Sequence, residues 1–194
     1  MVERLFFSWA NAFAVMALVG CGNVTVSIKG YQAFLDSQVI SFRKLPEAFA
    51  AGAQEHFRSD LSQVEFATGV DTLSGKVVTI GNRIYFPDQV RFNSRPHIVR
   101  MLHELEHVDQ YQKLGKQFIS KYSIQSLGST SEMLAKGKPR YKSIHDNIEL
   151  EKEAIEKAEL VLAQYRSFFC VKKGACASPF KSTFSEASLL SDEN

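Results

Sequence analysis

The chain lacks an excess of charge of either sign. Its 194 residues include 23 Lys and Arg against 21 Asp and Glu, for a formal net charge of +2. This balance excludes a broad basic face for nucleic acid, and we expect no nucleic-acid partner. Hydrophobic residues make up 45% of the chain and charged residues 23%, so a core can form. The length suits one domain.

A long membrane-spanning run is also lacking. The apolar stretch over residues 5–20 is too short for a span but suits a signal peptide. It ends in Leu-Val-Gly-Cys21, which resembles the bacterial lipoprotein box, where the chain is cut before an acylated cysteine. We therefore expect a signal peptide over 1–20 and a lipidated tether over 21–30. The alternatives are an uncleaved anchor helix and an ordinary secretory signal.

An acylated Cys21 predicts a place in the bacterial cell envelope, because each buried methylene contributes about 0.8 kcal/mol to membrane binding. No Asp follows Cys21 (Gly22 and Asn23 stand there), which favours the outer membrane, facing the periplasm.

Cysteines are few, and their number is odd. With Cys21 acylated, Cys170 and Cys176 remain, and we predict a disulfide that closes a small loop worth about 2 kcal/mol. The alternative is two unpaired thiols. Residues 171–194 are then this loop and a disordered, Ser-rich tail.

The remaining chain predicts an α+β domain over residues 31–170. Two β-prone runs around Gly81-Asn82 predict a hairpin in a small antiparallel sheet. A long helix begins near Ser94 and Pro96 and ends at Gly115. Before the hairpin we expect helices over about 31–42 and 46–61 and a strand over 63–67. After the first long helix we expect a looser segment over about 123–142 and a second long helix from about Asp146. The second long helix carries an apolar stripe at Leu150, Ala154, Ala158, Val161, Tyr165 and Phe169.

The first long helix contains the pattern H-E-x-x-H, from His103 to His107. Residues four apart share a helix face, so the two imidazoles can bind one Zn²⁺. Glu104 would reach water at the metal and act as a general base. The pattern therefore predicts a hydrolytic zinc site. The alternative is a charged, solvated helix face.

A catalytic zinc usually needs a third protein ligand, and no histidine lies a short way downstream of His107. Glu151 is the one carboxylate of the second long helix whose neighbours place it in the apolar stripe, where a buried acid needs a partner. We therefore expect Glu151 as the third ligand, with Glu153 and His145 as alternatives. A Lys or Arg could instead pair with Glu151.

The HELEHVDQ helix, followed by Glu151-Lys152-Glu153-Ala154, resembles the Glu-zincin metallopeptidases. A closer likeness is to a small, little-characterised bacterial family of metallopeptidase-like proteins that share an HELxHVxQ helix after a Gly-turn hairpin. The resemblance covers roughly residues 46–165. It implies a zinc site against the edge strand of a small sheet, which would hold an extended peptide by strand addition.

Several further residues carry weaker predictions. His145 and Tyr141 could donate to the oxyanion of a substrate, or could be loop residues. Gln110 could orient a ligand imidazole or face solvent, and Asp109 is expected at the surface. His56, His97 and the basic run 136–142 are expected to be structural or solvated, with anionic lipid headgroups as an alternative contact for the run.

Together these patterns predict a monomeric, membrane-anchored zinc peptidase acting on peptides or proteins. The alternative is a metal-stabilised envelope module for binding or assembly that performs no catalysis.

Overall fold

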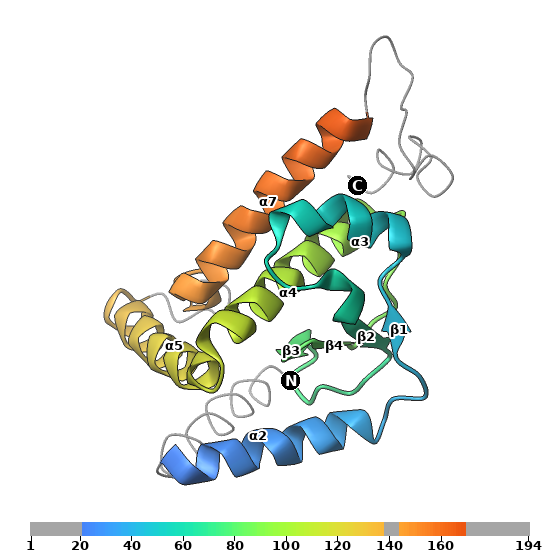
Figure 1. Cartoon of the computed structure of the whole chain (residues 1–194). Coiled ribbons are helices and arrows are strands. Elements are labelled where there is room, and N and C mark those ends of the chain that lie inside the picture. Colours follow the sequence, from blue (N-terminus) through green and yellow to red (C-terminus); the bar gives the residue numbers. More distant parts are fainter. Residues whose placement is uncertain (1–20, 138–143, 170–194) are drawn as a thin grey trace, which may run out of the picture.

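The computed structural model describes residues 21–137 and 144–169, and within them the fold is α+β (Figure 1). This confirms the predicted class. The helices are α2 (Cys21–Asp36), α3 (Glu47–Ala53), α4 (Arg95–Leu114), α5 (Gln117–Ala135) and α7 (Glu149–Phe169). The strands are β1 (Arg43–Lys44), β2 (Glu65–Thr68), β3 (Val78–Ile80) and β4 (Arg83–Phe86).

The four strands form one sheet in the order β1-β2-β4-β3, so β3 is an edge strand. The hairpin of β3 and β4 is confirmed, and Gly81 in its turn has a φ of +61°, a conformation that suits glycine. The prediction that the whole sheet is antiparallel is wrong, because β2 pairs with β4 in parallel. The chain crosses from β2 to the sheet edge at β3 and only then returns through the hairpin to β4.

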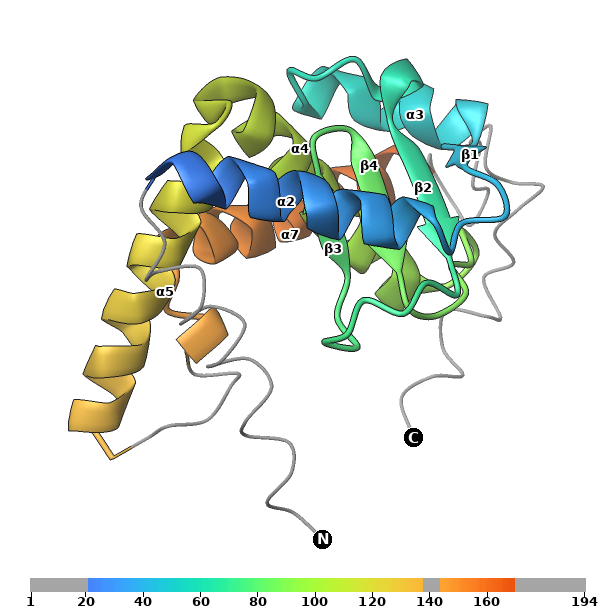
Figure 2. The same cartoon turned by 90° about the horizontal axis from the view of Figure 1, so that it is seen from below.

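The sheet lies between α2 on one face and α4 on the other (Figure 2), and alternate residues of its strands pack toward these two layers. Phe66, Ile84 and Phe86 join the core under α3 and α4. Ala67 and Tyr85 face the other way, toward α2. The period of two along each strand therefore places the sheet between helices on both faces.

Helix α4 forms as predicted, with Pro96 in its first turn and Gly115 at its end with a φ of +55°. Its buried stripe lies against α7, and the two helices run side by side (Figure 1). The α7 stripe is buried over Leu150, Ala154, Ala158 and Val161, while the side chains of Tyr165 and Phe169 lie outside the described residues. Helix α7 begins at Glu149, and Asp146 lies in the turn before it.

The expected tether over 21–30 is wrong, because α2 begins at Cys21. Ile28, Tyr31 and Leu35 continue one apolar face at helical spacing and pack under the sheet. The helix ends at Asp36, which accepts hydrogen bonds from Arg83 and Tyr85 (2.8 and 2.7 Å), and not at the predicted residue 42.

Two other helix boundaries differ from the prediction. Helix α3 ends at Ala53, followed by a 3₁₀ turn, because the Gln54 side chain bonds the backbone of Ser59 and Leu61 and folds the chain back. The segment predicted to be loose from residue 123 is helical to Ala135. The hydroxyl of Ser129 in α5 donates to the Ile144 carbonyl (2.6 Å) and joins the helix to the segment that follows.

Within the ranges described, no helix has both the length and the apolarity needed to span a bilayer. The predicted signal peptide, Tyr141, and the Cys170–Cys176 disulfide lie outside the described residues.

Candidate metal centre

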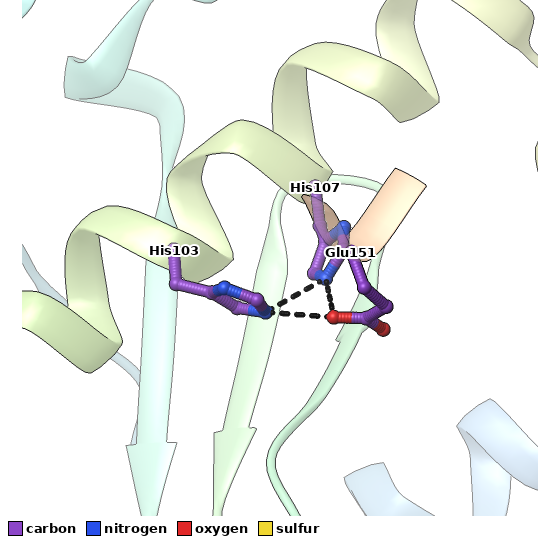
Figure 3. A group of neighbouring side chains, drawn as sticks. All are labelled: His103, His107 and Glu151. Atoms are coloured by element: carbon purple, nitrogen blue, oxygen red, sulfur yellow. Dashed lines mark hydrogen bonds and ion pairs between the residues drawn. The ribbon is translucent and has the colours of Figure 1, made fainter. Parts of the chain in front are cut away.

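Three side-chain atoms converge between α4 and α7 (Figure 3). The Nε2 atoms of His103 and His107 are 3.1 Å apart, and Glu151 Oε2 lies 3.0 and 3.3 Å from them. Ligand atoms about 2.0–2.1 Å from a tetrahedral zinc lie about 3.3 Å from one another. The buried group of His103, His107 and Glu151 could therefore hold a metal ion.

The sequence places each of these ligands. His103 and His107 are one helical turn apart on α4, and Glu151 lies in the first turn of α7, with only 3% of its surface exposed. Its neighbour Glu153 is exposed, as its polar helix face predicts. The structure thus brings Glu151 to the two histidines and leaves Glu153 outside the group.

Glu151 Oε2 is buried, and among the described residues it accepts no hydrogen bond of ordinary geometry, although imidazole nitrogens surround it. A buried polar atom without such a bond is costly. Atoms arranged around a shared centre, rather than along donor–acceptor lines, are typical of a ligand set. The donors fit a divalent ion that prefers imidazole and carboxylate.

His145 lies beside the group and outside it. Its Nε2 atom is 3.0 Å from Glu151 Oε2, and its ring stacks on that of His103 with centroids 6.2 Å apart. Burial alone would lower the pKa of His145, but the charges of Glu151 and Asp146 outweigh it and raise the pKa. The converging ligand atoms, all within 4.8 Å of one another, are those of His103, His107 and Glu151 alone among the described residues, so His145 suits a hydrogen-bond donor at the rim better than a third ligand.

Burial and nearby charges shift the pKa values of Glu151 and His107 in opposite directions. Burial would raise the pKa of Glu151, but the surrounding imidazoles hold it well below its usual range. Burial would lower the pKa of His107, but Glu151 and Glu104 raise it to about 9. Without metal, His107 is therefore a cation at neutral pH.

This protonation predicts how metal affinity depends on pH. A bound metal ion needs neutral imidazole, so it must displace the His107 proton. Metal affinity should rise by up to about tenfold per pH unit as the pH increases toward about 9 and then level off. The metal-free fold should show the opposite trend, because the stability from a raised pKa is complete below pH 6.5 and is lost toward pH 9. Chelator competition and thermal melts across this range measure both, and a flat affinity would contradict the assignment.

Gln110 fixes the tautomer of His107. Its amide nitrogen donates to the Leu150 carbonyl (2.9 Å) and to Glu153 Oε2 (3.1 Å), so the amide oxygen must face His107. The His107 Nδ1 atom, 2.8 Å away, therefore carries a proton and donates, so in the neutral imidazole that a metal needs the Nε2 lone pair faces the group. Of the two alternatives for Gln110, the structure supports the orienting one.

Replacing Gln110 by Leu should lower zinc affinity by about 10–100-fold, because the side chain that selects the tautomer is lost. Gln112→Leu, an exposed change on the same helix, is the matched control and should leave affinity unchanged. Competition with a chromogenic chelator measures both. Equal affinities for the two variants would show that Gln110 does not orient the ligand.

Glu104 lies next to the ligands without joining them. It is 6% exposed, and its Oε2 atom accepts a hydrogen bond from the hydroxyl of Thr79 in edge strand β3 (2.6 Å). Glu104 and the ligands line one wall of a cleft of about 620 Å³, with β3, α2 and α5 around it. This volume is typical of small-ligand and peptide sites.

Two residues of the site escaped the sequence analysis. The Tyr122 hydroxyl donates to Glu151 Oε1 (2.6 Å), which turns the other carboxylate oxygen toward the imidazoles. Thr79 holds Glu104. Tyr122 was missed because residues 116–122 are assigned to no element in the sequence analysis, although the spacing of Tyr122 from the buried Phe118 is helical.

Asp109 has a structural role that the surface prediction missed. It is partly buried and accepts hydrogen bonds from the backbone of Arg58 and Ser59 (2.9 and 2.8 Å), which anchors the chain after α3 to α4. His97 is structural, as predicted, since its Nδ1 atom accepts from the Arg91 backbone (2.8 Å).

Comparison with known families finds one match. Residues 44–115 match the model of the eCIS core domain. The eCIS core match runs from β1 to the end of α4, so it includes His103, Glu104 and His107 but neither α5 nor Glu151. It covers less than half of the chain, and its description names no activity. No curated protein and no solved structure matches the chain.

Proposed function

We propose that the protein is a zinc-dependent hydrolase of the Glu-zincin type, and specifically a peptidase. The observation that carries the proposal is the buried Glu151 carboxylate, brought by α7 to two imidazoles one helical turn apart on α4. Two imidazoles and one carboxylate form a ligand set found in catalytic zinc sites, which keep a position open. Structural zinc sites are usually closed by four protein ligands, often cysteines.

Zinc held by His103, His107 and Glu151 would supply a Lewis acid and lower the pKa of water in its open position. Glu104 would take the proton of the attacking water and pass it to the leaving amine. Thr79 holds one oxygen of Glu104 and leaves the other for this transfer. His145 is placed to donate a hydrogen bond to the carbonyl oxygen of the scissile bond.

The cleft supports a peptide as the substrate. Edge strand β3 lines it beside Glu104, and an edge strand can pair with an extended chain. Apolar side chains from α2 and α5, including Ile28, Phe118 and Ile119, line its other walls. Such walls would accept the side chains of the peptide, while Glu104 and the ligands meet its backbone.

The proposed setting is the bacterial cell envelope, with the chain anchored through acylated Cys21 in the outer membrane and facing the periplasm. This rests on the lipoprotein-box resemblance at residues 18–21.

Cleavage of a mixed peptide library tests the function. The zinc-loaded chain should cleave peptides, a strong chelator should stop cleavage, and added zinc should restore it. Metal analysis of the same samples should give one equivalent of zinc. Zinc at one equivalent with no cleavage would overturn the peptidase and favour a metal-stabilised binding or assembly module, which the eCIS core description also allows.

A further inference from the structure

Three large apolar side chains are exposed along one side of α5. Ile124 is 70% exposed, Leu127 51% and Leu134 59%. Spacings of three and seven residues place them in a single stripe. Phe118 and Met133, which are buried, lie on the opposite side of the helix and pack toward the body. The stripe of Ile124, Leu127 and Leu134 is called the α5 stripe below.

The charges of α5 and its ends favour an anionic partner. Lys116, Lys121 and Lys136 are exposed, and Glu132 is the one acidic residue between positions 116 and 136. Glu132 is engaged by Lys136 and accepts a hydrogen bond from Asn147 (2.8 Å). An apolar stripe bordered by lysines is typical of helices that lie in the interface of an anionic membrane.

The position of α5 also points to lipid. Figures 1 and 2 both place the first turn of α2 on the same side of the molecule as α5. Helix α2 includes Cys21, so helical backbone joins the proposed acylation site to the part of α2 that packs under the sheet. A bilayer that holds acyl chains on Cys21 would therefore lie close to the side of the molecule that carries α5.

We propose that the α5 stripe lies in the surface of an anionic lipid bilayer, beside the acylated Cys21. This inference rests on the membrane anchoring in the proposed function and is independent of the peptidase activity. It also sets the orientation of the domain. The opposite side of α5, with Phe118 and Tyr122, lines the cleft, so this contact would hold the cleft close to the membrane surface.

Tryptophan fluorescence of the processed, acylated chain tests the contact, because the single native tryptophan, Trp9, lies in the predicted signal peptide. Leu127→Trp places a reporter in the α5 stripe, and Leu160→Trp, at a similarly exposed position on α7, is the matched control. Each is mixed with vesicles of phosphatidylethanolamine and phosphatidylglycerol with brominated acyl chains, and the introduced tryptophan is the only one in the processed chain. Quenching should be at least about threefold stronger for Leu127→Trp. Adding Ile124→Gln and Leu134→Gln should remove this difference.

Two outcomes would overturn the proposal. Equal quenching of Leu127→Trp and Leu160→Trp would show that α5 does not enter the lipid. A concentration-dependent blue shift of Leu127→Trp without vesicles would instead assign the α5 stripe to a second copy of the chain. Peptide cleavage by the parent chain is measured separately, so failure here leaves the proposed activity standing.

Discussion

Replacing Glu104 by Gln should lower the rate of peptide cleavage by about 10²–10⁴-fold and leave zinc content unchanged. Glutamine has nearly the shape of glutamate and can still accept the Thr79 hydrogen bond through its amide oxygen. It cannot take a proton from water. Because Glu104 is not one of the converging ligands, the metal site should survive the change.

The matched control is Glu106→Gln, two residues away on the same helix. Burial and the nearby Asp109 raise the pKa of Glu106 to about 7, so the change replaces a side chain that is partly protonated at neutral pH. Glu106 does not line the cleft, and this variant should cleave at the parent rate. Equal cleavage by Glu104→Gln and the parent would refute Glu104 as the base.

Glu151→Gln should have the largest effect on the fold and on metal binding together. It removes one of three ligands, so zinc affinity should fall by at least about 100-fold. Losing a residue that only hydrogen-bonds to a ligand usually has a smaller effect. It also leaves the imidazolium of His107 buried without its carboxylate. Breaking a buried pair costs about 3–5 kcal/mol, and we expect about 3 kcal/mol because the imidazole can release its proton.

The free energy of unfolding of the metal-free chain at neutral pH measures this loss of stability. Because the pKa of Glu151 is lowered in the fold, its contribution to stability is complete above its ordinary pKa and is lost in acid. The difference in stability between the parent and Glu151→Gln should therefore shrink as the pH falls. Glu156→Gln, an exposed change on the same helix, should alter neither stability nor zinc affinity. Unchanged zinc binding in Glu151→Gln would exclude Glu151 as a ligand.

Local patterns predicted much of the site because its geometry is local. His103, Glu104 and His107 share one helix with a clear start and end, so their spacing defines their arrangement. The choice of Glu151 followed from its helical neighbours, since a carboxylate in an apolar stripe becomes buried once that stripe packs. The hairpin followed from its glycine turn.

The features that were missed depend on contacts between distant segments. The parallel pairing of β2 with β4 has no local signal, because it depends on how the chain crosses to the edge. Helix α5 is rich in Ser and contains Gly128, which are weak helix formers, and tertiary contacts of Phe118 and Met133 override that preference. The role of Gln110 stayed open because its partner, the Leu150 carbonyl, lies forty residues away.

The Gln110 amide makes assembly of the metal centre depend on how two helices fit. One side chain holds both the His107 ring and the carbonyl of Leu150, the residue just before Glu151. If α7 moved away from α4, the same displacement would withdraw Glu151 and leave His107 without the hydrogen bond that selects its tautomer. A chain in which α7 has not docked on α4 would therefore lack the complete ligand group. The proposed hydrolytic activity would arise only with the finished fold, which would spare the cell that makes the protein until then.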